Sequence, residues 1–443
     1  MTQTNYFSRK IDNELLAWSK EENRKVLLLR GARQVGKSSA VRNLGKSFKY
    51  YVEINFDDAD EQVRELFKPG ISPQEICMKL SALTVTPIVP GETLLFLDEL
   101  QACVPAISKL RYFYEQYPEL HVIAAGSLLE FAFNELPSFG VGRIRSMFMY
   151  PFSFEEFLFA SGKEPWIHAI RNANPQNPVF EGLHSQLINQ LHIFNLIGGM
   201  PAVVSEFVKN QDFLQCQELL NDILVSFRND FAKYKKQVPA IRINEIFESV
   251  AKQAEGKFIY ERAAVQSSNR QVKDALELLV MAGLVYPVTH TAANGIPLGA
   301  EINPKIQRMF LFDTGLFQRI LNLNISDILL SNDFKTINRG ALAEIFVALE
   351  ITKASSCYSP VSLYYWQREK SQSTAQIDFL IQKHYQIIPI EVKSGTQGAM
   401  QSLRLFMKEK EISKGIRTSL ENFAQYENIE VFPMYAIGNL IRE

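Results

Sequence analysis

The chain has 443 residues, which at roughly 100–200 residues per domain is enough for several domains that bury their own cores without disulfide bonds. Hydrophobic residues make up 47% of it and charged residues 21%, a balance that excludes disordered, collagen-like and coiled-coil proteins. The 47 Lys and Arg residues nearly cancel the 48 Asp and Glu residues, so no chain-wide charge attracts nucleic acid or anionic lipid, and any such binding must be local.

The four cysteines, Cys77, Cys103, Cys216 and Cys357, lie far apart in the sequence and form no CxxC pair or Cys/His cluster. This spacing excludes a zinc knuckle and a disulfide framework, and it is typical of a protein in a reducing cytosol. The first residues carry charges where a signal peptide needs an apolar core, and no window approaches the roughly 18 apolar residues of a membrane span. We therefore expect a cytoplasmic protein with no membrane partner.

Residues 1–165 alternate short apolar runs with amphipathic stretches. The apolar runs are residues 25–30, 50–56, 92–99, 120–127 and 145–154. Continuous apolar runs bounded by polar turns predict buried parallel strands, and the stretches between them have the apolar spacing of helices. This order predicts an α/β domain with a parallel sheet.

The segment GARQVGKS, which begins at Gly31, fits the pattern GxxxxGK[ST] and lies between a predicted strand and a predicted helix. Gly31 and Gly36 allow backbone N–H groups to turn inward around phosphate oxygens, and the helix N-terminus adds partial positive charge. Lys37 is placed to reach the β- and γ-phosphates. Ser38 offers a hydroxyl to Mg²⁺, and Ser39 follows at the start of the helix. The segment is therefore a predicted P-loop.

The apolar run of residues 94–97 ends in Asp98 and Glu99, at the sheet edge where ligands of open α/β sheets bind. Asp98 is placed to help hold Mg²⁺, directly or through water. Glu99 is placed to polarise the attacking water, which favours an ATPase of the AAA-like branch over a kinase or a G protein. An acidic pair at a strand end is by itself also typical of a solvated turn, and the P-loop decides between the two interpretations.

Three further polar residues follow in this part of the chain. Ser127 ends the next apolar run, where it either senses the γ-phosphate or caps a helix. Arg143 and Arg145 precede the following strand, and either is a candidate arginine finger that acts on ATP in another subunit of a homo-oligomer. Surface salt bridging is the alternative for both arginines.

From residue 166 to residue 330 long amphipathic stretches predict a mainly helical region. Residues 243–256, 260–266 and 268–283 predict three helices, the last with Ser268 or Asn269 as N-cap, and residues 284–291 predict a β-wing. This order suggests a winged helix. Its third helix carries Arg270, Gln271 and Lys273, which suit phosphates or base edges, but residues 241–290 contain six basic and six acidic residues, and plain packing is the preferred alternative.

Residues 331–443 return to a mixed pattern, which indicates a separate C-terminal α/β domain. Glu391 and Lys393 are two apart in a predicted strand, so they share one face of it. Asp378 lies thirteen positions before Glu391, a separation suited to two antiparallel strands joined by a turn near residues 383–385. The two carboxylates are then expected to meet across the strand pair.

These motifs together resemble a family of prokaryotic AAA-type ATPases that pair an N-terminal P-loop domain with a C-terminal region of the DUF4143 type. The resemblance spans nearly the whole chain and implies ATP binding with hydrolysis. Besides the P-loop, it is carried by LFLDELQ (95–101), AAGS (124–127), GVGR (140–143), PFSFEEFL (151–158), GGMPAVV (198–204), FLFDTGL (310–316), and IDFLIQ with IPIEVKSG (within 377–395).

The family's C-terminal domain is thought to share the PD-(D/E)xK nuclease fold, and Asp378, Glu391 and Lys393, with Glu344 on an earlier helix, resemble its pattern. Asp378, Glu391 and Glu344 are then candidate ligands of Mg²⁺ or Mn²⁺, and the Val392 carbonyl is a further candidate. Lys393 is placed to position water or to steady phosphate charge during phosphodiester cleavage. The pattern is short, and polar residues are common on one face of a half-exposed strand, so a plain polar face is the alternative.

Charge does not separate these interpretations, because residues 331–443 contain 13 basic and 12 acidic residues. The first hypothesis for the whole chain is a Mg²⁺-dependent ATPase whose hydrolysis rearranges the helical and C-terminal domains on a nucleic-acid or protein partner, with nuclease activity left open. The second is a nucleotide-regulated interaction protein whose nuclease-like domain is an inactive scaffold. DNA cleavage that needs a metal and is lost in Glu391→Ala distinguishes the two.

Overall fold

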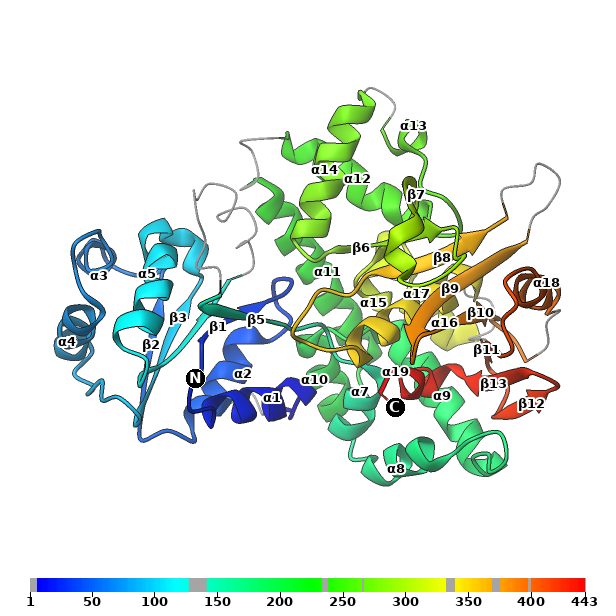
Figure 1. Cartoon of the computed structure of the whole chain (residues 1–443), viewed down its shortest axis with the longest axis horizontal. Helices are drawn as coiled ribbons and strands as arrows, with labels where there is room; N and C mark the ends of the chain where they lie inside the picture. The colour runs from blue at the N-terminus through cyan, green and yellow to red at the C-terminus, as the bar shows by residue number, and fades with distance from the viewer. Residues whose placement is uncertain are drawn as a thin grey trace. The chain divides into compact units, whose positions relative to one another are not determined.

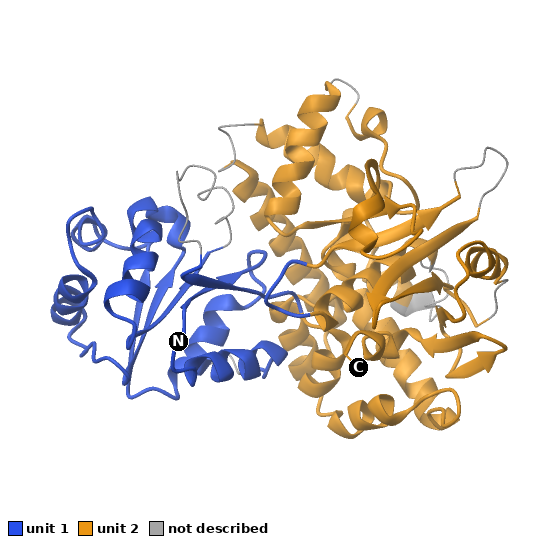
Figure 2. Ribbon diagram, in the orientation of Figure 1, with its two compact units in different colours: residues 1–151, 356–360 blue, residues 152–355, 361–443 orange. Residues whose placement is uncertain are grey.

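The computed structural model describes residues 6–126, 142–232, 238–264, 267–331, 339–368, 375–396 and 400–442. The chain forms two compact units (Figure 2). Unit 1 consists of residues 1–151 and 356–360, and unit 2 of residues 152–355 and 361–443. Within the described stretches, every helix is too short or too polar to cross a membrane.

Unit 1 contains a five-stranded sheet in the order β2-β3-β4-β1-β5, and every neighbouring pair is parallel (Figure 1). The strands are β1 (Val26–Arg30), β2 (Tyr50–Asn55), β3 (Thr93–Asp98), β4 (His121–Ala125) and β5 (Ile144–Phe148). β3 and β4 are buried along their whole length, as continuous apolar runs predict. The predicted α/β domain with a parallel sheet is confirmed.

Helices of unit 1 pack against this sheet through apolar stripes. They are α1 (Lys10–Ser19), α2 (Lys37–Gly45), α3 (Glu61–Glu65), α4 (Pro73–Thr84), the 3₁₀ turn η1 (Leu100–Ala102) and α5 (Val104–Gln116). α4 begins where Ser72 Oγ accepts a hydrogen bond from the Glu75 N–H at 3.2 Å, with proline at the first helical position. Leu80 of α4 and Leu110 of α5 join Leu95 and Leu97 of β3 in one buried cluster. This core holds the strands in place, and the predicted phosphate site lies at their carboxyl ends.

The fifth strand is shorter than the sequence predicts. The apolar run continues to residue 154, but β5 ends at Phe148 and helix α7 (Phe154–Ala160) begins soon after. Ser153 and Glu156 form a capping box, in which each side chain accepts the other residue's backbone N–H. A strong helix start inside an apolar run therefore ends the strand early.

Unit 2 begins with a group of helices. They are α7 and then α8 (Glu164–Asn172), α9 (Glu181–Ile197), α10 (Pro201–Asn210), α11 (Phe213–Phe231), α12 (Ala240–Lys252), α13 (Tyr260–Ala263) and α14 (Asn269–Met281). α12 and α14 lie side by side, and α13 contacts both (Figure 1). A capping box between Ser268 and Gln271 starts α14, so Ser268 is the N-cap. The predicted helical middle region is confirmed.

The rest of unit 2 is built on an eight-stranded mixed sheet in the order β12-β13-β11-β10-β9-β8-β6-β7. Its strands are β6 (Val285–Thr291), β7 (Ile302–Leu311), β8 (Leu363–Gln367), β9 (Gln376–Lys383), β10 (Gln386–Val392), β11 (Gly415–Ser419), β12 (Ala424–Tyr426) and β13 (Ile429–Pro433). The remaining helices are η3 (Leu298–Glu301), α15 (Thr314–Ile320), α16 (Ile325–Ser331), α17 (Arg339–Ala354), α18 (Gln401–Glu409), η4 (Met434–Ala436) and α19 (Asn439–Arg442).

The sheet crosses the domain boundary predicted near residue 330. Three helices followed by the β6–β7 hairpin have the order expected of a winged helix, but β6 also pairs in parallel with β8. The hairpin therefore extends the C-terminal sheet, and the predicted ranges 166–330 and 331–443, apart from residues 356–360, lie in one compact unit. The winged-helix assignment and the three-domain division stay predictions.

Candidate functional site

The loop between β1 and α2 has the backbone that its glycines predict. Gly31 has a φ of 142° and Gly36 a φ of 99°, values that side-chain-bearing residues rarely adopt. A Cβ atom at Gly31 would also collide with the carbonyl oxygen of Met149. Gly36 is the N-cap of α2, so the loop leads directly into the helix N-terminus at Lys37.

Lys37 is a buried cation held by the loop itself. Its Nζ donates hydrogen bonds to the carbonyl oxygens of Gly31 and Ala32, both at 2.9 Å. Burial lowers the pKa of Lys37 to about 8, while the nearby charges of Glu99 and Asp98 act in the opposite direction. The ammonium group is thus bonded to neutral acceptors, which a charged ligand can replace.

Ser38 and Asp98 meet although they are sixty positions apart in the sequence. The Ser38 hydroxyl donates to Asp98 Oδ2 at 2.6 Å, and Asp98 Oδ1 accepts the Glu99 N–H at 3.0 Å. In the sheet, β4 lies between β1 and β3, so the loop after β1 and the acidic end of β3 flank the end of β4. A hydroxyl and a carboxylate therefore lie together beside the loop, as the sequence predicts.

Glu99 follows β3 in a left-handed backbone conformation with a φ of 46°. Its side chain accepts a hydrogen bond from Gln101 Nε2, which belongs to the same LFLDELQ segment. Gln101 therefore holds the Glu99 side chain, a role that the sequence does not predict. Its place in the LFLDELQ segment is the one sequence feature that points to it.

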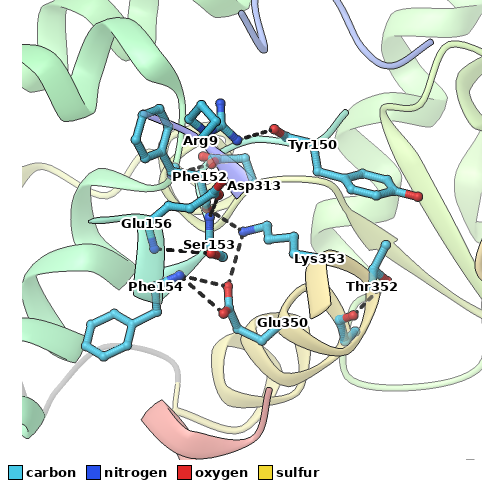
Figure 3. A network of polar contacts seen from close by, with 12 residues as sticks. Arg9, Tyr150, Phe152, Ser153, Phe154, Glu156, Asp313, Glu350, Thr352 and Lys353 are labelled. Atoms are coloured by element: carbon cyan, nitrogen blue, oxygen red, sulfur yellow. Dashed lines mark hydrogen bonds and ion pairs between the residues drawn. The ribbon is translucent and has the colours of Figure 1, made fainter. Parts of the chain in front are cut away.

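Arg9 is a second supporting residue that the sequence does not indicate. Its buried guanidinium donates to the Val35 carbonyl in the P-loop at 3.2 Å and to the Tyr150 carbonyl at 2.8 Å (Figure 3). It therefore ties the loop to the segment that follows β5. A single arginine before an amphipathic stretch carries no motif, so its role becomes visible only in three dimensions.

The other predicted residues of unit 1 have mixed outcomes. Ser127 lies outside the described residues. Arg143 forms an ion pair with Glu115, and its side chain is 46% exposed. Arg145 forms an ion pair with Glu21. The salt bridges expected as the alternative are thus present, and the arginine finger stays a prediction.

The C-terminal strands pair as expected. β9 and β10 form an antiparallel hairpin whose turn residues, His384 and Tyr385, both have positive φ. Phe379 pairs with Ile390, so the same register continued by one step sets Asp378 opposite Glu391. The predicted turn and strand pairing are confirmed.

Each of these carboxylates has a protein partner. Asp378 Oδ2 accepts the Val392 N–H at 2.8 Å, and Glu391 forms an ion pair with Lys393 at 2.8 Å. Glu344 forms an ion pair with Arg308, a residue of β7 whose guanidinium is also 3.8 Å from Asp378 Oδ1. Burial raises the pKa of both Asp378 and Glu391 and lowers the pKa of Arg308.

A divalent cation does not fit this arrangement. Across the described part of the chain, no three His, Cys, Asp or Glu side chains are grouped so that they could hold a metal ion. Arg308 lies where the candidate ligands Glu344 and Asp378 converge. The Val392 group that contacts Asp378 is its N–H, so the main chain offers a donor there.

Three segments that carry the resemblance meet elsewhere in unit 2 (Figure 3). Asp313 of FLFDTGL accepts the N–H groups of Gly199 at 2.7 Å and Leu316 at 3.0 Å, and Phe152 of PFSFEEFL donates its N–H to the Gly199 carbonyl at 2.7 Å. Lys353 Nζ donates to the Phe152 carbonyl at 2.9 Å. These segments therefore hold unit 2 together through hydrogen bonds to one another.

Family models match three parts of the chain: an AAA domain over residues 23–158, a domain of unknown function (DUF8612) over residues 188–327, and DUF4143, also a domain of unknown function, over residues 339–437. No curated protein matches the chain.

Several solved structures are similar over much of the chain at low identity. The Walker-type ATPase of Pyrococcus abyssi is 16% identical over 72% of this chain and 97% of its own, with a TM-score of 0.47. The Aeropyrum pernix ORC1 protein in complex with DNA is 12% identical over 75% and 96%, with a TM-score of 0.30. The Thermotoga maritima RuvB Holliday junction branch migration motor is 12% identical over 63% and 89%, with a TM-score of 0.29. At these TM-scores the structures carry no further argument.

The AAA model and the DUF4143 model match the N-terminal and C-terminal parts of the resemblance stated from the sequence. The five-stranded parallel sheet lies within the range of the AAA model. The nuclease-like part of the resemblance stays a prediction. The chain thus combines an N-terminal AAA domain of the P-loop type with a C-terminal DUF4143 domain, as in the family of ATPases that the sequence resembles.

Proposed function

We propose that the chain binds ATP with Mg²⁺ at the P-loop and hydrolyses it. The observation that carries the proposal is the 2.6 Å contact between the Ser38 hydroxyl and Asp98, beside a loop whose buried Lys37 donates to two backbone carbonyls. The AAA family model over residues 23–158 supports the same conclusion.

The residues beside the loop suit Mg²⁺, which takes hard oxygen ligands. The Ser38 hydroxyl and the Asp98 carboxylate are such ligands, and the ion supplies positive charge to the β- and γ-phosphates when it is bound. Loop N–H groups and the N-terminus of α2 bind phosphate oxygens. Lys37 exchanges its two carbonyl partners for phosphate oxygens, because a charged acceptor forms the stronger hydrogen bond.

Glu99 orients and polarises the attacking water in this proposal. Its carboxylate follows the metal-binding Asp98 directly and is held by Gln101, which limits the directions in which it can point. Ser39 and Ser127 are the remaining proposed contacts to nucleotide, and Arg143 is the proposed finger of a homo-oligomer.

Two substitutions separate binding from turnover. Lys37→Ala is expected to weaken ATP binding at least 100-fold, whereas Glu99→Gln keeps ATP affinity within about threefold and loses at least 100-fold in turnover, because only the second removes the water-polarising group. Matched controls are Lys46→Ala, an exposed lysine just after α2, and Glu92→Gln, just before β3. Equal hydrolysis by wild type and Glu99→Gln would remove Glu99 from this role.

We further propose that hydrolysis is coupled to rearrangement of unit 2 on a nucleic-acid or protein partner in the cytoplasm. The free cysteines fit a reducing compartment. Phosphodiester cleavage at Glu344, Asp378, Glu391 and Lys393 is left out of the proposal because a metal does not fit there. The ion pairs of these residues favour an inactive scaffold domain, which is one part of the second hypothesis from the sequence, the nucleotide-regulated interaction protein.

A further inference from the structure

Arg308 is among the most deeply buried charged residues of unit 2. β7 is exposed or half-buried at its start and becomes buried from Arg308 onward, and the Arg308 side chain is 1% exposed. A guanidinium stays protonated even where burial lowers its pKa, so a full positive charge lies inside the protein. Such a charge is tolerated only where partners compensate for lost water.

The partners of Arg308 come from different parts of unit 2. Its Nη2 atom forms an ion pair with Glu344 of α17, and Nη1 is 3.8 Å from Asp378 Oδ1 of β9. The rings of Phe310 and Tyr365 lie 5.1 Å and 5.9 Å from the guanidinium, within the range of cation–π attraction. The guanidinium is therefore held by carboxylates and by aromatic rings together.

The same carboxylates are the expected ligands of a nuclease-like metal site. A Mg²⁺ ion needs several oxygen atoms at roughly 2.1 Å, converging on one point. Here the guanidinium takes that place for Glu344 and Asp378, and its positive charge repels a second cation. Glu391 forms an ion pair with Lys393, and its Oε2 atom is buried without a hydrogen-bond partner, as are Nε and Nη1 of Arg308. One such oxygen does not make a chelate.

We propose that Arg308 is a built-in counter-ion that stands in place of a divalent cation in this nuclease-like cluster. It neutralises Glu344 and Asp378 and so ties β7 to α17 and β9 without a metal. In the C-terminal domain, Glu344 and Asp378 then stabilise the fold as ion-pair partners of Arg308 and do not bind a metal. This inference does not depend on ATP binding, and failure of the P-loop proposal would leave it standing.

Direct Mn²⁺ binding tests the inference. The full-length chain carrying Asp98→Asn, which removes the carboxylate expected to bind metal at the P-loop, is titrated without nucleotide, and free Mn²⁺ is measured by electron paramagnetic resonance. We expect no bound Mn²⁺ at millimolar concentration and no change in melting temperature. One Mn²⁺ bound per chain, lost on adding Asp378→Asn, would overturn the inference.

Substitution of Arg308 tests the cause. In the same Asp98→Asn chain, Arg308→Ala is expected to raise Mn²⁺ affinity at least tenfold, while Arg308→Lys, which keeps the charge, and Arg404→Ala, which removes an exposed arginine, leave it unchanged. A folded Arg308→Ala protein that gains no Mn²⁺ would show that the guanidinium does not exclude the ion. Should Arg308→Ala fail to fold, the titration with Arg308 present and the Arg308→Lys variant still decide.

Discussion

Lys37 in unit 1 and Arg308 in unit 2 are both buried cations near carboxylates, yet they are bonded to different partners. Lys37 donates to two backbone carbonyls, and Asp98 nearby accepts from the Ser38 hydroxyl. Arg308 is paired with Glu344 and faces Asp378. The first set of bonds joins charged groups to neutral ones, and the second joins opposite charges.

This difference separates the proposed ligand site from a cluster in which the buried cation is already paired with carboxylates of its own unit. A neutral carbonyl yields its place to phosphate because the charged acceptor binds an ammonium group more strongly. A carboxylate paired with a buried guanidinium has no better partner to gain, and separating the two leaves uncompensated charge. The bonding partners of a buried charge therefore indicate function better than the charge itself.

The largest expected effect on stability comes from removing the cation of the Arg308, Glu344 and Asp378 cluster. Arg308→Met keeps much of the side-chain volume but leaves Glu344 and Asp378 without their cation, so the free energy of unfolding is expected to fall by about 3–5 kcal/mol. Urea unfolding measures it. Arg228→Ala, which removes an exposed ion pair with Glu248, is the control and should cost at most about 1 kcal/mol. Equal losses in both variants would contradict the comparison.

The sequence predicts the P-loop site around Lys37 far better than the cluster around Arg308, because the residues of the P-loop site lie in two short, continuous segments. Eight consecutive residues from Gly31 define the loop, and an apolar run ending in Asp98 locates the acidic strand end. The β9–β10 hairpin is predictable for the same reason, since its turn is short and sets Asp378 opposite Glu391.

Arg308 has no comparable signal. It lies far from Asp378 in the sequence, and β8 and β6 separate β7 from β9 in the sheet. The polar start of β7 resembles an exposed strand, and the arginine lies among residues of α17 and β9 and the rings of Phe310 and Tyr365. The early end of β5 is hard to predict for a related reason, because the capping box at Ser153 competes with an apolar run that favours a strand.

A carboxylate satisfied by N–H groups is expected to matter less than one tied to a guanidinium. Asp313→Ala leaves the Gly199 and Leu316 N–H groups without an acceptor inside unit 2, so the free energy of unfolding should fall by about 2–3 kcal/mol. Asp313→Asn keeps one oxygen acceptor and should lose about half as much. Urea unfolding of both variants tests this, and a larger loss for Asn than for Ala would exclude the explanation.

The pH dependence of ATP binding sharpens the comparison at Lys37. Burial lowers its pKa to about 8, and phosphate binding requires the charged form. ATP affinity should therefore level off about one unit below pH 8 and fall up to tenfold per pH unit above it, which equals about 1.4 kcal/mol per unit. Titrations with a fluorescent ATP analogue between pH 7 and pH 9, about one unit either side of the transition, measure this.

The stability of the nucleotide-free protein should change in the opposite direction over this range. Between the folded pKa of about 8 and the ordinary lysine value of 10.5, the unfolded chain binds more protons at Lys37 than the folded chain does. Its contribution to the free energy of unfolding therefore rises with pH in that window. Lys37→Ala, measured by urea unfolding at both ends of the window, should lack this contribution, and an ATP affinity that is flat across pH 8 would contradict the assignment of the pKa.

The smallest expected effect on stability is at Arg143, whose charge is exposed and whose partner Glu115 is on the surface. Arg143→Ala should change the free energy of unfolding by less than about 1 kcal/mol. If Arg143 acts on ATP in another subunit, the ATPase rate per chain rises with protein concentration, and Arg143→Ala removes that rise without weakening ATP binding. Glu115→Gln is the matched control, because it breaks the same ion pair but keeps the arginine, and it should preserve the rise. An ATPase rate that is independent of protein concentration and unchanged in Arg143→Ala would leave the salt bridge with Glu115 as the role of Arg143. Arg143 would then resemble Arg308, as an arginine paired with a carboxylate of its own unit.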